Sequence, residues 1–333
     1  MAKCIRVPKS EGEPVRRALM EEGLLDMDYR IGSEGDSILM PVLCDGYRGY
    51  AAEEAELRPS NRGETDYKDI ADVPDGLKEY LPKSFDVIGD IAILKLEDCL
   101  VPYRAAIGEA LMKVTPNIRA VFLDGGVKGD FRVRELEKIA GSGTSEVIHR
   151  EYGTRMMTDP SKVYFNPRLA TERARVASMV EDGEVVIDMF AGVAPFGTVI
   201  CRHARPSMVY SIDLNPECER FMKENMRLNH IRNMECIIGD STEVVRKLPK
   251  ADRIIMNLPQ MADRFLDSAL RSVKLSGIIH MHKIMERSEL EPFQKEMAKR
   301  MADEGLGMRV VRVSELKTYS PTMSVYVFDI CPE

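Results

Sequence analysis

An apolar strand that runs into a turn of small residues is the feature that most constrains how this chain can fold. Residues 185–187 are Val-Val-Ile, Asp188 follows them, and residues 191–194 are Ala-Gly-Val-Ala. Small side chains in such a turn let a ligand approach the backbone. In open α/β sheets, ligands bind outside the carboxyl ends of the strands, where this turn opens. The pattern therefore predicts a mostly parallel sheet with a ligand site at that edge.

Three predicted strands downstream of the turn each end in a polar residue. The strand over 208–212 ends in Asp213, about 20 residues after the turn, where an acidic residue can accept hydrogen bonds from ribose hydroxyls. The next strand ends in Asp240, which is positioned to meet an adenine amino group, and the fourth ends in Asn257. Four such elements in this order predict the cofactor site of an S-adenosylmethionine-dependent methyltransferase.

A dinucleotide-dependent dehydrogenase is the competing interpretation, because it also has a strand, a glycine-rich turn and an acidic residue. The G-x-G-x-x-G fingerprint of that class is absent, and Pro195 stands where a helix N-terminus would bind pyrophosphate. Residues 257–259, Asn-Leu-Pro, have no role in hydride transfer. A single aspartate at a strand end is often only a turn or N-cap residue. The order of all four elements favours the methyltransferase.

Composition excludes several classes of protein. The chain has 333 residues, enough for two or three domains, and 44% are hydrophobic, enough for packed cores. Its seven cysteines include no C-x-x-C pair, so neither a disulfide framework nor a metal site is predicted, and a reducing cytoplasm is expected. No apolar run approaches the ~18 residues that span a bilayer, so we expect a protein without membrane contact. We also expect a monomer.

The charge distribution is more informative than the net charge of −7, which argues against a general nucleic-acid binder. Between residues 132 and 175, nine basic residues face six acidic ones, a local excess of three just before the predicted cofactor domain. A solvated surface of mixed charge is the simpler interpretation of this segment.

The first part of the chain reads as a small α+β domain over residues 1–60. A helix is predicted over 14–20 and a strand over 37–42. The polar stretch over 59–66 is rich in turn-forming residues and suits a linker.

A second α+β domain is predicted over residues 61–165. The pattern indicates a strand pair within 85–94, a helix over 105–112, and strands over 120–123 and 131–133.

Residues 166–333 alternate strands and helices, which is typical of a parallel sheet wrapped by helices. Helices are predicted over 217–228 and 261–275, and strands over 308–313 and 324–330 form an antiparallel edge hairpin. The predicted fold class is α/β, a Rossmann-like class I methyltransferase domain preceded by two small α+β domains.

Five stretches carry a pattern that points to one family, at residues 85–92, 131–136, 163–173, 188–192 and 257–259. Together they resemble the tRNA (guanine-37 N1)-methyltransferases of the archaeal and eukaryotic type. The resemblance covers nearly the whole chain and implies that residues 1–60 read the tRNA and that residues 61–165 contribute to the active site. One departure is Ala194, where the family usually has glycine.

The resemblance also implies a catalytic site for tRNA with guanine at position 37. Guanine N1 carries a proton, so methylation needs a base near N1 and a positive charge near O6. The family pattern assigns Glu172 as the base and Arg132 as the O6 partner, while Asn257 orients the exocyclic amino group. The implied cofactor-binding residues are Tyr164, Arg173, Asp188, Phe190, Gly192, Val193, Pro195, Asp213, Leu214, Asp240, Ser241, Asn257 and Pro259.

Without the resemblance, the same residues have simpler interpretations. Glu172 and Arg173 would form an exposed pair at a helix start, and Arg132 and Arg134 would both face solvent from one strand. Two histidines, at 280 and 282, would lie in the core or at the surface, since no third metal ligand is apparent near them.

Two other functions stay open. The first is a related transferase of wyosine biosynthesis, which uses the same cofactor for aminocarboxypropyl transfer or methylates a tricyclic guanine; the Asn-Leu-Pro element at 257–259 argues against it. The second is a non-catalytic tRNA-binding protein, against which the presence of Glu172, Arg132 and Asn257 together argues. A methyltransferase of proteins or small molecules would not need the first two domains.

Overall fold

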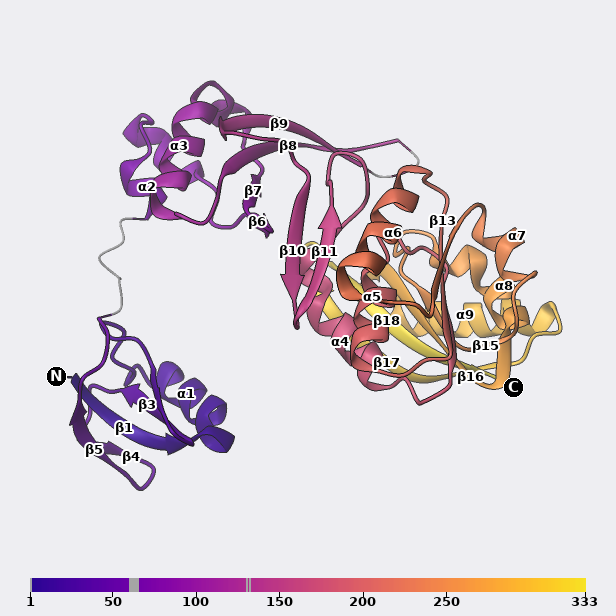
Figure 1. Cartoon of the computed structure of the whole chain (residues 1–333), viewed down its shortest axis with the longest axis horizontal. Coiled ribbons are helices and arrows are strands. Elements are labelled where there is room, and N and C mark those ends of the chain that lie inside the picture. The colour runs from indigo at the N-terminus through magenta and orange to yellow at the C-terminus, as the bar shows by residue number, and fades with distance from the viewer. Residues whose placement is uncertain (1, 60–65, 130, 132) are drawn as a thin grey trace. The chain divides into compact units, whose positions relative to one another are not determined.

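The computed structural model describes residues 2–59, 66–129, 131 and 133–333 (Figure 1). The chain divides into two compact units, Met1–Asp72 and Val73–Glu333. In the described part of the chain, no helix has both the length and the apolar character that crossing a membrane requires.

The first unit is a five-stranded antiparallel sheet with helix α1 packed on it. The strand order is β2-β3-β1-β5-β4, and Ile5 and Val7 of the central strand pack with Leu19 of α1. The helix predicted over 14–20 and the strand predicted over 37–42 are confirmed. The elements are β1 Ala2–Pro8, α1 Gly12–Glu21, β2 Gly32–Glu34, β3 Ser37–Pro41, β4 Gly46–Tyr47, β5 Tyr50–Ala55 and α2 Tyr67–Ile70.

The second unit begins with a four-stranded sheet in the order β6-β7-β8-β9. Helix α3 connects β7 to the parallel strand β8 and buries Ile107 and Leu111. The predicted strand pair and the predicted helix are confirmed. The elements are β6 Asp86–Ile88, β7 Ile91–Leu94, α3 Arg104–Val114, β8 Ala120–Lys128 and β9 Val133–Gly141.

The strand predicted over 131–133 is wrong in extent. Strand β9 begins at Val133 and continues to Gly141, although Glu135 and Glu137 interrupt its apolar pattern. Strand β9 is longer than its apolar pattern indicates because pairing with β8 along this length gives its backbone groups hydrogen-bond partners. Residue 132 and the linker residues 60–65 lie outside the described residues.

A hairpin that the sequence pattern does not indicate follows this sheet. It consists of β10 Val147–Glu151 and β11 Thr154–Thr158, joined by a turn in which Gly153 has a φ of 75°. The side-chain oxygen of Asn225, on helix α6 (Glu217–Asn229), accepts a hydrogen bond from the backbone N–H of Met157 at 2.6 Å. The hairpin is therefore anchored to a helix that follows it in the chain.

The largest sheet has seven strands in the order β14-β13-β12-β15-β16-β18-β17. Its first five strands run parallel, and β18 and β17 are antiparallel to their neighbours. The elements are α4 Ala170–Ser178, β12 Val185–Asp188, α5 Pro195–His203, β13 Met208–Asp213, α6 Glu217–Asn229, β14 Met234–Ile238, α7 Ser241–Val245, β15 Ala251–Met256, α8 Leu266–Ser272, β16 Val273–Glu286, α9 Leu290–Asp303, β17 Met308–Thr318 and β18 Met323–Pro332.

This sheet confirms the predicted α/β class and the antiparallel hairpin at its edge, with one correction to a helix. Within the hairpin, β17 is the outermost strand and β18 pairs with β16. The helix predicted over 261–275 stops at Ser272, and Val273 already pairs with Ala251 of β15. A helix and the start of a buried strand are both apolar here, so the pattern alone does not separate them.

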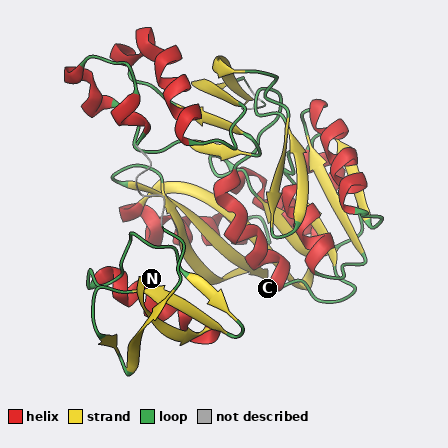
Figure 2. Ribbon diagram, turned by 60° about the vertical axis from the view of Figure 1, so that its left-hand side comes forward, coloured by secondary structure: helices red, strands yellow, loops and turns green. Residues whose placement is uncertain are grey.

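Helices cover both faces of the large sheet (Figure 2). Val186 of β12 packs in one core cluster with residues of α4, α5 and α6, whereas its neighbour Ile187 packs in a second cluster with residues of α7, α8 and α9. Successive side chains of a strand point to opposite faces, so a continuous apolar run is what a strand buried on both faces requires.

Helix α6 ends in a residue with a strained backbone. His230 is exposed and has a φ of 56°, in the left-handed region. Glycine adopts this conformation without the clash of a Cβ atom, so His230→Gly is expected to raise the free energy of unfolding by about 1 kcal/mol. His230→Ala keeps the Cβ atom and should stay within about 0.5 kcal/mol of the wild type. Urea unfolding measures both, and equal stabilities of the two variants would contradict the prediction.

Candidate functional site

The polar strand ends identified in the sequence lie along one edge of the large sheet. Asp188 of β12 pairs with Ser211 of β13 on one side and with Ile255 of β15 on the other. Asp213, at the end of β13, pairs with Ile238 of β14. The register thus brings the carboxyl ends of four parallel strands to one edge, where ligands of such sheets bind.

The turn after β12 is built around backbone rather than side chains. Gly192 has a φ of 55°, and a Cβ atom there would lie 3.0 Å from the carbonyl oxygen of Tyr164. Its N–H donates to Oδ2 of Asp213 at 2.6 Å, so the turn and the second strand end are bonded directly. Ala194 also adopts the left-handed conformation, with a φ of 58°, and Pro195 begins helix α5. This alanine holds a backbone shape that favours glycine.

Two buried oxygen atoms at this edge have no hydrogen-bond partner among the described residues. They are Oδ2 of Asp188 and Oδ1 of Asn257. The other oxygen of Asp188 accepts from the N–H of Phe190 at 3.3 Å. Burial raises the pKa of Asp188 to about 7. Buried acceptors without partners are rare in folded proteins, so a ligand that donates hydrogen bonds fits this edge.

The third strand end has a different local role. Oδ1 of Asp240 accepts from the N–H of Thr242 at 2.8 Å and from its hydroxyl at 2.6 Å, which caps helix α7. These hydrogen bonds lower the pKa of Asp240. Ser241 is buried beside it, and Leu214, which follows the second strand end, is 58% exposed. An exposed leucine at this edge offers an apolar surface to a ligand.

Arg173 is a buried residue whose donors are taken up inside the protein. Its Nε and Nη2 each donate to a carboxylate oxygen of Glu151 at 2.6 Å, and Nη1 donates to the backbone oxygen of Asn166 at 3.1 Å. Its guanidinium also lies over the ring of Phe165. Arg173 and Glu172 are both buried, so the interpretation of an exposed pair is wrong. The pair of Arg173 with Glu151 ties α4 to the hairpin.

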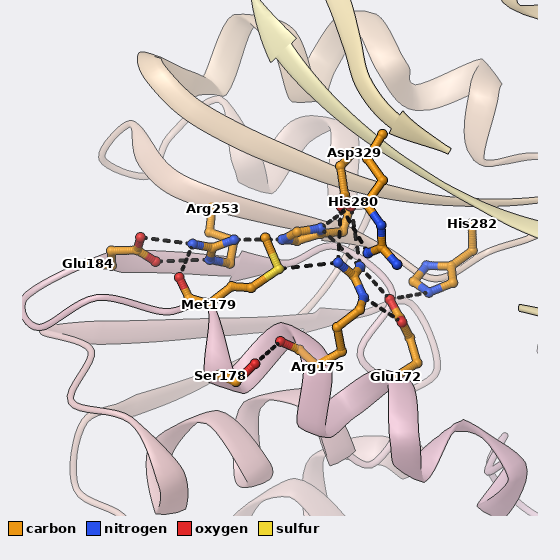
Figure 3. Close-up of polar contacts among 10 residues, drawn as sticks. Glu172, Arg175, Ser178, Met179, Glu184, Arg253, His280, His282 and Asp329 are labelled. Carbon is orange, nitrogen blue, oxygen red and sulfur yellow. Dashed lines mark hydrogen bonds and ion pairs between the residues drawn. The ribbon is translucent and has the colours of Figure 1, made fainter. Parts of the chain in front are cut away.

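Glu172 is held on both carboxylate oxygens by one arginine (Figure 3). Nη2 and Nε of Arg175 donate to them at 2.7 and 2.8 Å, and Nε2 of His282 lies 3.5 Å from Oε1. Burial alone would raise the pKa of Glu172, but the hydrogen bonds from Arg175 and the nearby ring of His282 lower it to about 2. Glu172 is therefore a carboxylate at neutral pH.

Arg175 begins a chain of buried charges that crosses the sheet (Figure 3). Its Nη1 donates to Oδ2 of Asp329 at 3.0 Å, and Oδ1 of Asp329 lies 2.5 Å from Nδ1 of His280. Nε2 of His280 lies 2.7 Å from Nη1 of Arg253, whose other nitrogens donate to Glu184 at 3.0 Å. This chain links α4 to β18, β16 and β15.

Sequence reasoning missed the partners of Glu172. The spacing of His280 and His282 on an apolar strand was visible, and both side chains prove to be core residues with no exposed surface. Nothing in the local sequence marks Arg175 or Asp329 as their neighbours. Among the described residues, no three His, Cys, Asp or Glu side chains are arranged to hold a metal ion.

The predicted residue Arg132 lies outside the described residues, but its neighbour Arg134 is described. Nη2 of Arg134 donates to Asp86 at 2.9 Å, and Nη1 donates to Asp124 at 3.3 Å. The interpretation that Arg134 only faces solvent is therefore wrong. Asp86 also accepts from Nε of Arg168 at 2.8 Å, which joins the four-stranded sheet to the segment before α4.

Comparisons with known proteins match nearly the whole length of the chain. The model of the tRNA methyltransferase 5 N-terminal domain matches residues 4–45, that of the TYW2 N-terminal domain matches residues 69–144, and that of the TRM5/TYW2 methyltransferase domain matches residues 147–311. The chain is 41% identical over 323 residues to the tRNA (guanine(37)-N(1))-methyltransferase Trm5b of Pyrococcus abyssi, and the match covers 96% of each chain.

Solved structures agree with this similarity. The crystal structure of wild-type Trm5b from Pyrococcus abyssi superposes with a TM-score of 0.75 at 40% identity and covers 100% of both chains. A complex of aTrm5 with tRNALeu superposes with a TM-score of 0.69 at 32% identity and covers 98% of each chain.

The buried carboxyl of Asp188 gives the fold a defined pH dependence. In an unfolded chain an aspartate ionises near pH 4, whereas the pKa of Asp188 in the folded protein is about 7. The folded state keeps a proton that the unfolded state loses, so the contribution of Asp188 to stability is greatest below about pH 4 and is lost as the pH rises to about 7. The side chain of Asp188→Asn cannot ionise, so this variant should not lose that stability. Its free energy of unfolding should exceed that of the wild type by up to about 4 kcal/mol at about pH 8.

Chemical unfolding at about pH 4.5 and about pH 8, without added ligand, measures this difference. Asp182→Asn is the matched control. Asp182 is exposed, so this substitution should leave the wild-type pH dependence of stability unchanged. The prediction fails if wild type and Asp188→Asn lose the same stability between the two pH values.

Proposed function

The chain belongs to the TRM5/TYW2 methyltransferase family, and we propose that it transfers the methyl group of S-adenosylmethionine to N1 of guanine 37 in tRNA. The observation that carries this proposal is the 41% identity to Trm5b over 96% of both chains, which includes the N-terminal domains as well as the methyltransferase domain. The similarity to a complex with tRNALeu supports tRNA as the substrate.

The residues at the strand edge fit S-adenosylmethionine. Asp188 and Asn257 each present a buried acceptor without a partner, which the N–H donors of an amino acid or adenine moiety would satisfy. The backbone around Gly192 leaves room for close approach. When bound, the cofactor supplies an electrophilic methyl group on a sulfonium. We further assign the following residues to the cofactor pocket: Tyr164, Arg173, Phe190, Val193, Pro195, Asp213, Leu214, Asp240, Ser241 and Pro259.

The roles of the residues around the guanine follow from two demands of the reaction: N1 loses a proton and negative charge develops on O6. N1 must lose its proton, and we assign Glu172 as the base because it is a carboxylate at neutral pH. We assign Arg132 to stabilise the negative charge that develops on O6. Asn257 accepts from the exocyclic amino group and so orients the base.

The register of the strands supports a common site for Glu172 and Asn257. Met256 pairs with Met281, so Asn257 and His282 are the next residues on the two neighbouring strands. His282 in turn lies 3.5 Å from Glu172. The backbone of Asn257 therefore lies next to that of His282, whose ring is close to Glu172.

The three parts of the chain have different proposed roles. We propose that residues 1–60 recognise the folded tRNA away from the anticodon, that residues 61–165 contribute to the active site, and that residues 166–333 bind the cofactor. Residues 1–60 carry eight basic against twelve acidic residues, which disfavours a diffuse phosphate clamp. Recognition then depends on a few directed contacts. We also propose a monomer in the cytoplasm, where the seven free cysteines stay reduced.

The direct test offers labelled S-adenosylmethionine and tRNA transcripts with guanine or adenine at position 37. Only the guanine transcript should accept label, and digestion should yield N1-methylguanosine, because a base beside N1 and a cation beside O6 suit guanine alone. Strong labelling of the adenine transcript would refute this assignment. A product that carries the aminocarboxypropyl group instead would favour the wyosine-pathway alternative.

Glu172→Gln keeps the shape of the side chain and removes its basicity. We expect turnover to fall roughly 10²- to 10⁴-fold while the affinity for S-adenosylmethionine stays nearly unchanged. Glu181→Gln, an exposed change just after α4, is the control and should retain full activity. Normal turnover of Glu172→Gln at saturating substrate would show that Glu172 is not the base.

Deleting residues 1–60 tests the role of the first domain. The truncated enzyme should lose the preference for full-length tRNA over an isolated anticodon stem-loop, because contacts to the folded tRNA are gone. Binding of S-adenosylmethionine, measured by calorimetry, should persist. If the truncated protein still strongly prefers full-length tRNA, recognition lies in residues 61–333.

A further inference from the structure

His282 is a buried imidazole that the fold leaves without hydrogen bonds. It lies on β16 with none of its surface exposed, and neither ring nitrogen has a hydrogen-bond partner among the described residues. Phe196 of α5 packs against the ring at a centroid distance of 6.0 Å. The charged group beside it is the carboxylate of Glu172, 3.5 Å from Nε2. Leaving a buried polar group without a hydrogen bond costs about 1–3 kcal/mol of stability, and such groups in folded proteins often have a functional role.

His280, two residues earlier on the same strand, shows what a structural histidine looks like here. Both of its ring nitrogens are engaged, Nδ1 by Asp329 at 2.5 Å and Nε2 by Arg253 at 2.7 Å. The two side chains share one face of β16 and are equally buried. Only His282 keeps both nitrogens free beside the proposed base.

Glu172 itself is a poor final holder of a proton. Arg175 binds both of its oxygens, and Arg175 is in turn fixed by Asp329. The pKa of Glu172 is lowered to about 2, so the protonated carboxyl is strongly disfavoured. In model peptides an imidazole takes up a proton about two pH units above a carboxylate. A proton that reaches Glu172 is therefore expected to move to a stronger base within reach.

We propose that the proton that leaves guanine N1 passes through Glu172 to Nε2 of His282, so that His282 is the final proton acceptor of methyl transfer. The inference rests on the proposed function. The N1–H bond breaks, its electron pair becomes available for the new N1–CH₃ bond, and an oxygen of Glu172 takes the proton. Glu172 then passes the proton to neutral His282. The cofactor leaves as a neutral thioether, and the site retains an imidazolium beside a carboxylate.

The charges around His282 suit this role. Glu172 and Arg175 face it from α4, His280 precedes it on β16, and Asp329 lies on the neighbouring strand β18. Arg175 would oppose a positive imidazolium, but it is paired with both Glu172 and Asp329. The carboxylate of Glu172 therefore remains as a close counter-ion for the protonated ring.

The test is the pH dependence of single-turnover methylation of tRNA with guanine at position 37, compared in the wild type and His282→Gln. The wild-type rate should fall in acid through one inflection, because a protonated His282 cannot accept a further proton. Glutamine keeps an N–H near Glu172 but cannot hold a proton. His282→Gln should lose this inflection and fall about 10- to 100-fold on the alkaline plateau.

Two further measurements separate proton acceptance from a structural role. The affinity of His282→Gln for S-adenosylmethionine and its KM for tRNA should stay within about 2-fold of wild type, and His282→Asn is examined in the same way should the glutamine variant unfold. His203→Gln, which changes an exposed histidine, is the control and should keep the wild-type profile.

The outcomes are distinct. A His282→Gln or His282→Asn enzyme that retains the wild-type rate and inflection overturns the inference and leaves the proposed function intact. A wild type that does not methylate the guanine transcript overturns both. Loss of the inflection with unchanged binding supports His282 as the proton acceptor.

Discussion

The buried chain of charges from Glu172 to Glu184 is the interaction on which the arrangement of the site depends. Arg175 and Arg253 each lie between acceptors, and Asp329 and His280 join them, so every member has a partner of suitable charge. Removing one member of such a buried set leaves its partner unpaired, which typically costs about 3–5 kcal/mol. The chain therefore holds helix α4 in one position against the sheet.

The fixed position of α4 matters because this helix carries two neighbouring residues with different tasks. Arg173 points its donors to Glu151 of the hairpin and to the backbone of Asn166, which orders the segment that precedes the helix. Glu172 faces Arg175 and His282 of strand β16. Consecutive residues of a helix point in directions about 100° apart, so one helix can join the hairpin and the sheet at once. The C-terminal hairpin thus contributes to the site through Asp329, although it contains no residue of the cofactor turn.

Local chemistry explains which parts of the site could be predicted. A strand that ends in an aspartate and continues into Ala-Gly-Val-Ala needs only its own residues to define a turn, and the structure contains that turn at Gly192 and Ala194. The hairpin of β10 and β11 escaped prediction because its anchor, Asn225, lies on a helix 68 residues away. The C-terminal end of α8 escaped because a buried helix and a buried strand have the same apolar composition where they meet.

The sequence by itself determined the order of the strands' polar ends, the parallel sheet and the family, because each depends on residues close together in the chain or on similarity along its whole length. Only the tertiary structure decided how Glu172 is held. Arg175 meets Asp329 across 154 residues of sequence, and His282 reaches Glu172 from a strand more than a hundred residues later. Such long-range pairs leave no periodic pattern, because their geometry exists only after the sheet has set its register. The charge state of Glu172 and the unpaired nitrogens of His282 are consequences of that register.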